Sequence, residues 1–190
     1  MRHANYVHAL RCLLRGQDPF HDVDFLRTLT PGDEALRDST NLTHALLHQQ
    51  MMALRTLAAN DELNELRLQS LDGTLLDFLN IQGGCERIKG TPLPRGYGFI
   101  VEMLIRFFAL MLPMSLVHEL GFGAVPLNVV ICLAFALISE TGRVLEDPFS
   151  LYFNGLPLHN LSTKIERNIR ERIGGEELPP DIQAVDGVLM

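Results

Sequence analysis

Two histidines spaced four residues apart are the first candidates for chemistry in this chain. His44 and His48 have the spacing of two metal ligands on one helix face. No Glu lies between them and no third ligand is evident nearby in the sequence. We therefore expect no metal site, and we interpret the two histidines as solvated or facing a partner.

The cysteines and carboxylates give no sign of catalysis. A cation beside a cysteine can activate its thiol, but we interpret Cys85, which lies near Arg87, as a small packed residue. The sequence has no Ser/His/Asp or Cys/His arrangement, no phosphate loop and no paired catalytic carboxylates. The three cysteines are widely spaced without a CxxC pair, which favours reduced thiols over disulfides or zinc. We expect no enzyme and no cofactor.

Charged residues also occur inside a long apolar segment. Residues 97–117 and 125–139 are mostly apolar, and residues 118–124 form a short connector between them. A bilayer core requires roughly 20 apolar residues per helix, so we predict a transmembrane hairpin over residues 97–142. Glu102 and Arg106 lie four apart and can pair, and Asn128 could face another helix. The alternative is a buried helix pair in a soluble protein, which the polar remainder of the chain disfavours.

Charge distribution predicts how the hairpin is oriented and which ligands are excluded. The connector has no Lys or Arg, whereas basic residues precede the first span and follow the second. This pattern places both ends in the cytoplasm, so we expect a multi-pass plasma or inner membrane protein. The net charge of −7 offers no basic footprint for nucleic acid.

Helical periodicity dominates the rest of the sequence, which lacks alternating strand patterns. We predict an all-α protein with helices at residues 2–15, 42–58, 62–82 and 157–173, a short helical turn at residues 24–29 and a helix N-terminus at residues 30–34. The 42–58 helix has one stripe that includes Met52, and the last helix has an i, i+4 stripe of Leu158, Leu161, Ile165, Ile169 and Ile173. Residues 83–94 should be a break and linker, and residues 176–190 a loose tail.

Two ordered motifs flank the hairpin and carry a resemblance. The first is Gly83-Gly-Cys-Glu-Arg-Ile-x-x-Thr-Pro-x-Pro94, followed by an apolar span with Leu112-Pro113. The second is Leu145-Glu-Asp-Pro-Phe149, followed by Asn154-x-Leu-Pro-Leu158. These motifs resemble the bestrophin family, in its bacterial chloride-channel branch. The resemblance covers residues 1–175, with residues 1–96 mainly cytosolic and residues 143–175 returning to the cytosol.

The resemblance implies an oligomeric ion channel, a homo-pentamer, that passes monovalent ions and chloride by family label. It places a cytosolic pore constriction near Leu66. The motif residues would be structural, with packing favoured over ion binding for the acids: Gly83, Gly84, Cys85, Glu86, Arg87, Thr91, Pro92, Pro94, Glu146, Asp147, Pro148 and Phe149.

The sequence departs from the family in two ways. The acidic run of the animal calcium clasp is absent after Phe149, and Gly155 and His159 stand at family Asp positions, so calcium gating is not carried over. The family's first two membrane helices and hydrophobic neck would lie upstream of residue 1. We therefore expect the 190 residues alone to form no regulated channel. The alternative is a non-conducting membrane-anchored scaffold or a truncated remnant.

Overall fold

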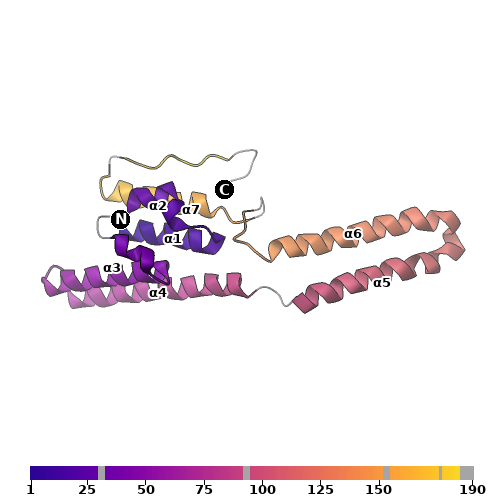
Figure 1. The fold of residues 1–190 in the computed structure, drawn as a ribbon, viewed down its shortest axis with the longest axis horizontal. Helices are drawn as coiled ribbons and strands as arrows, with labels where there is room; N and C mark the ends of the chain where they lie inside the picture. The colour runs from indigo at the N-terminus through magenta and orange to yellow at the C-terminus, as the bar shows by residue number, and fades with distance from the viewer. Residues whose placement is uncertain (30–32, 92–94, 152–154, 176, 185–190) are drawn as a thin grey trace. The chain divides into compact units, whose positions relative to one another are not determined.

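The computed structural model describes residues 1–29, 33–91, 95–151, 155–175 and 177–184, with residues 26, 33–35 and 95–97 described by backbone alone. Within these ranges the chain is helical and has no strand, as the sequence predicts. Two units are present, Met1–Lys89 with Phe149–Met190, and Gly90–Pro148. The elements, drawn in Figure 1, are α1 (Arg2–Arg15), η1 (Pro19–His21), α2 (Val23–Thr28), η2 (Asp33–Asp38), α3 (Leu42–Ala59), α4 (Glu65–Gly90), α5 (Arg95–Leu120), η3 (Gly121–Gly123), α6 (Ala124–Leu145) and α7 (Leu158–Arg172).

Helix α1 is the centre of the first unit and contacts α2, α3 and α7. It ends at Gly16, whose left-handed φ of 65° lets its N–H cap the carbonyls of the last turn. The apolar core contains Tyr6, Ala9, Phe25, Leu36, Leu46 and Leu47. The predicted helix over residues 2–15 is confirmed. Residues 30–32, where a helix start was predicted, lie outside the described residues.

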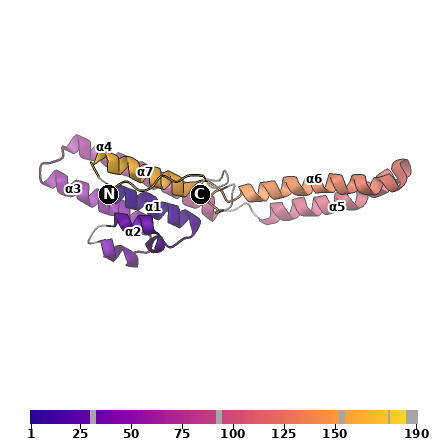
Figure 2. The same cartoon turned by 90° about the horizontal axis from the view of Figure 1, so that it is seen from above.

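Helix α4 lies antiparallel to α3 (Figures 1 and 2) and packs on the core through Leu75, Phe78 and Leu79. The predicted end near residue 82 is wrong, because α4 continues through Gly83 and Gly84 to Gly90. A glycine inside a helix costs about 1 kcal/mol, which the packing of this long helix offsets. Met52, on the stripe of α3, is 47% exposed.

Helix α7 buries a polar face rather than its apolar stripe. The buried residues are Asn160, Ser162, Thr163 and Glu166, whereas Leu161 and Ile165 are 48% and 39% exposed. The apolar stripe is therefore not the face that α7 buries. The polar face turns inward because residues outside α7 bond to most of it: His8 and Arg11 on α1 bond to Glu166 and Ser162, and the carbonyl of Ile182 accepts from Asn160.

The segment after α7 is docked rather than loose over residues 177–182. Three side chains of α7 donate to backbone carbonyls of this segment: Arg170 to Glu177, Arg167 to Pro179 and Asn160 to Ile182. Pro179 is fully buried. The chain thus runs back along α7, held by side-chain donors at successive turns.

The second unit is a helical hairpin in which α5 and α6 lie side by side (Figures 1 and 2). Gly121, with φ of 51°, opens the turn between them. Glu102 and Arg106 pair at 2.9 Å, and Asn128 Nδ2 donates to the carbonyl of Ala109 on α5 at 3.3 Å, which confirms both expectations. By length and composition, one described helical stretch, Gly98–Leu145, could cross a membrane, and only 6% of its most apolar window is buried.

Candidate functional site

The outward face of α4 is open and carries Leu66. At 3.6 residues per turn, this face lies opposite the side that packs on the core. Leu66 is 74% exposed, and a Cβ added at Gly73 or Gly84 would meet no heavy atom within 4 Å. Between the apolar Leu66 at its start and the exposed Ile81 and Ile88 near its end, the face presents small and polar residues: Ser70, Gly73, Asp77, Asn80 and Gly84.

The end of α4 clamps the helix to its neighbours. Gln82, which is buried, donates to Thr43 Oγ1 on α3 and to Glu86 Oε1, both at 2.7 Å. Lys89 Nζ donates to the carbonyls of Leu13 and Leu14 at 2.7 and 2.6 Å. These carbonyls belong to the last turn of α1, where a cation is favoured by the helix dipole.

Tyr6 joins α1 to the middle of α4. Its hydroxyl donates to the carbonyl of Phe78 at 3.3 Å. Burial, with smaller contributions from the nearby Cys85 and Glu86, raises the pKa of Tyr6 to about 12. Tyr6 therefore keeps its proton and its hydrogen bond at neutral pH.

The predicted motif residues separate into structural positions without forming a single site. Glu86 takes part in the α3–α4 clamp, Cys85 is half-buried and Arg87 and Thr91 are exposed. Pro92 and Pro94 lie outside the described residues. Phe149 is buried, while Glu146 caps the end of α6 through its backbone and is followed by Asp147 and Pro148.

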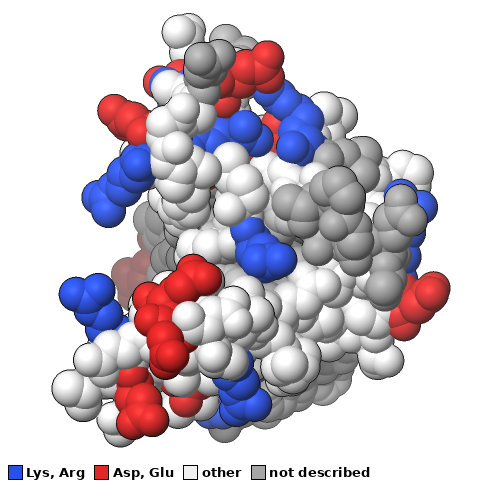
Figure 3. All heavy atoms as spheres, turned by 90° about the vertical axis from the view of Figure 1, so that its left-hand side faces the viewer, with Lys and Arg blue, Asp and Glu red and all other residues white. Residues whose placement is uncertain are grey.

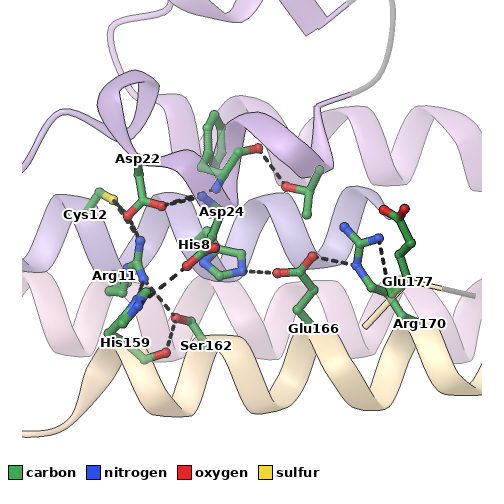
Figure 4. A network of polar contacts seen from close by, with 12 residues as sticks. His8, Arg11, Cys12, Asp22, Asp24, His159, Ser162, Glu166, Arg170 and Glu177 are labelled. Carbon is green, nitrogen blue, oxygen red and sulfur yellow. Dashed lines mark hydrogen bonds and ion pairs between the residues drawn. The ribbon is translucent and has the colours of Figure 1, made fainter. Parts of the chain in front are cut away.

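A buried polar network, drawn in Figure 4, joins the beginning of the described chain to its last helix. Arg11 is 3% exposed and pairs with Asp22, which also caps α2 through Asp24 N at 2.9 Å. Arg11 contacts His159 Nδ1 as well, and His159 Nε2 lies 3.6 Å from Asp24. One guanidinium thus bridges the α1–α2 connection and α7.

A second branch of the network lies one turn along the same interface (Figure 4). His8 Nε2 lies 2.8 Å from Glu166 Oε2, with both side chains at most 1% exposed. Arg170 Nε donates to Glu166 Oε1 at 2.6 Å. Desolvation raises the pKa of Glu166, but the hydrogen bonds from His8 and Arg170 outweigh it, so the pKa lies below its ordinary value.

Sequence reasoning did not find this network. Its members are spread over residues 8–170 and show no motif spacing. The available signal was a set of polar residues on the α7 face opposite to the apolar stripe. Such a set is also the signature of a solvated face, and only the contact with α1 tells the two apart.

Within the described ranges, no three potential metal ligands converge on the histidine pair. His44 and His48 instead lie at the edge of a groove between α3 and α4. Burial raises the pKa of the Cys12 thiol, which leaves it a packed residue. Figure 3 shows acidic and basic side chains interspersed on one face of the molecule, without a field of a single sign.

Comparison with known proteins identifies what this arrangement is similar to. A family described as Bacterial/Fungal Bestrophin protein matches residues 1–171. The voltage-dependent anion channel-forming protein RSc3414 of Ralstonia nicotianae is 31% identical over 177 residues, which are 93% of this chain and 58% of the relative. The similarly named YneE of Escherichia coli is 29% identical over the same shares of both chains. The crystal structure of a bacterial bestrophin homolog from Klebsiella pneumoniae aligns with a TM-score of 0.84 at 27% identity, over 93% of this chain and 65% of that one. This chain spans less than two thirds of the length of each of these relatives.

Proposed function

Because this chain belongs to the bacterial and fungal bestrophin family, we propose that it is the C-terminal portion of a subunit of an oligomeric channel that passes monovalent ions, with anions as the class that the relatives' names indicate. Five copies are the number that the family resemblance implies. The proposed bestrophin-like domain comprises residues 1–175, with residues 1–96 and 143–175 mainly on the cytosolic side.

The observation that supports this proposal best is the open face of α4. A 26-residue helix rises about 39 Å, and in a ring of copies this length would form the wall of an aqueous path. Small and polar side chains, which leave room for water, suit such a wall. Leu66, a large apolar residue in the first turn of α4, is the proposed constriction.

The hairpin supplies the membrane anchor in this proposal. The side chains of α5 and α6 are largely exposed within the unit, including Phe107 at 63% and Ile138 at 69%. Lipid would cover them, and the backbone hydrogen bonds are satisfied within the helices, as a bilayer requires. Both ends of the hairpin face the cytoplasm, and Glu102 with Arg106 face protein or the interface.

Conduction is tested in two arms, because the chain spans 58% of the Ralstonia relative. One arm is the 190-residue chain; the other is the same chain fused behind the N-terminal segment of that relative. We expect unitary currents in planar bilayers from the fusion and none from the 190 residues. Reversal potentials in a salt gradient then give the ion selectivity.

The results of the two arms distinguish a channel from a non-conducting scaffold. Silence from both arms, with oligomers verified by native mass spectrometry, would refute conduction and favour the non-conducting scaffold. Reproducible closing events from the 190 residues alone would show that no further segment is needed.

A further inference from the structure

The apolar stripe of α7, defined here as Leu158, Leu161, Ile165 and Ile169, is exposed at Leu161 and Ile165 among the residues that the structure describes. The opposite, polar face of the helix is the one packed on α1. A helix that turns its polar face inward and leaves an apolar stripe outside is typical of an interface. The bare stripe therefore calls for a second partner.

The chain's own terminal segment is not that partner over the described residues. Its carbonyls bind Asn160 and Arg167. At 3.6 residues per turn these two residues lie on the flank of α7 opposite to Leu161 and Ile165. The docked segment covers one flank and leaves the stripe bare.

A groove of complementary shape lies elsewhere on the same unit. It is a cavity of about 170 Å³ between α3 and α4. Its lining is mainly apolar, from Leu47, Met51, Leu75, Leu76 and Leu79, and His44, His48 and Asp72 complete it. Leu76 is 57% exposed, so the apolar lining is accessible. A ridge of leucine and isoleucine side chains fits such a groove between two helices.

The unit has a second cavity, and the charges around the two cavities favour the α3–α4 groove as the partner of α7. Exposed Lys164 and Arg172 border the stripe on α7, and exposed Glu65 and Asp72 lie on the groove side of α4. The second cavity, of about 360 Å³, is bordered by Arg2, and the described residues that line it include no Asp or Glu, so its charge does not complement α7. Opposite charges at the rim of a contact set its register and exclude wrong pairings.

We propose that the apolar stripe of α7 docks into the α3–α4 groove of a second copy of this chain. The two surfaces are different faces of one unit, so the contact is heterologous, and a heterologous contact that closes on itself generates a ring. This inference rests on the proposed oligomeric channel and specifies the surface through which its copies associate.

Disulfide trapping tests the contact in the full chain in detergent. Cys85 and Cys132 are replaced by Ser, and the fully buried Cys12 is kept. Chains with Ile165→Cys are mixed with chains with Leu76→Cys and oxidised. We expect a covalent dimer from the mixture and little from either chain alone. The matched control is Glu171→Cys, at an exposed position of α7 away from the apolar stripe, which should not cross-link to Leu76→Cys.

A charge reversal provides a second readout. Asp72→Lys should weaken association at least tenfold, and Lys164→Glu in the same chain should restore it, because both rim charges are then exchanged. Both positions are exposed, so folding is preserved. No restoration in the double variant would count against the pairing.

Native mass spectrometry separates this proposal from the channel proposal. Oligomers without the 165–76 cross-link would overturn the interface and leave the channel standing. Dimers from Ile165→Cys alone would mean that stripe packs on stripe, and would also overturn it. Protection of Ile165→Cys from labelling by added phospholipid vesicles, without a cross-link, would assign the stripe to lipid instead. Monomers alone would remove both the interface and the oligomer.

Discussion

His8 and Glu166, 158 residues apart in the sequence, share a hydrogen bond of 2.8 Å between Nε2 and Oε2 and are both shielded from solvent. Glu166 also accepts a bond from Arg170. Replacing Glu166 by Ala would leave His8 and Arg170 without their acceptor inside the protein. Breaking a buried charged pair costs about 3–5 kcal/mol.

We therefore expect Glu166→Ala to lower the free energy of unfolding by about 3 kcal/mol or more, measured by denaturant unfolding in detergent. The control is Glu171→Ala, an exposed glutamate on the same helix, which should change stability by less than about 0.5 kcal/mol. Equal effects of the two substitutions would contradict a special role for Glu166.

The lowered pKa of Glu166 also predicts how the stability of the protein depends on pH. Its pKa is below the ordinary value of 4.5 in the folded protein, so the folded state binds the proton less readily than the unfolded state. The stabilisation is fully present above the unfolded pKa and is lost as pH falls through the folded one. Below pH 4.5 the melting temperature should fall more steeply in the wild type than in Glu166→Gln, which has no titrating carboxyl. Parallel curves would refute the linkage.

The orientation of the hairpin is tested by cysteine labelling in intact cells. Phe122, at 98% exposed, is the reporter for the connector, and the exposed Asn168 on α7 is the reporter for the other side. A membrane-impermeant maleimide should label Phe122→Cys from outside and Asn168→Cys only after lysis. The background is the chain with Cys85 and Cys132 replaced by Ser. Labelling of position 168 in intact cells would reverse the assignment.

Leu66 is expected to limit conductance. Replacing it by Thr in the conducting fusion removes an apolar barrier to water, so the single-channel conductance should rise several-fold, with little loss of stability because Leu66 is 74% exposed. The control is Leu71→Thr, which lies on a different side of α4. A higher conductance in Leu71→Thr but not in Leu66→Thr would show that the constriction does not lie at Leu66.

Asp77 is expected to influence selectivity, because it lies on the same open face of α4 and carries a negative charge. A ring of carboxylates attracts cations. Asp77→Asn should therefore shift the reversal potential of the fusion toward that of chloride in a potassium chloride gradient. Glu171→Gln, on α7, serves as the control with the same charge change. An unchanged potential would place Asp77 away from the ion path.

The sequence alone determined where the main helices lie, because helical periodicity, the Gly16 stop and the length of the apolar segments are local properties. It also determined the family, through ordered motifs that need no structure to be compared. The extension of α4 through Gly83 and Gly84 was not determined in this way. Glycine is only a weak local stop signal, and long-range packing of Gln82 and Lys89 overrides it.

Only the tertiary structure decided which face of each helix is buried. Periodicity shows that Leu161 and Ile165 share one face of α7 and that Ser162 and Glu166 share another, and hydrophobicity favours burying the first pair. The structure buries the second, because His8 and Arg11 on α1 supply hydrogen-bond partners. A polar face is buried only where distant residues satisfy it, and such partners are brought together by the fold rather than by any spacing in the chain.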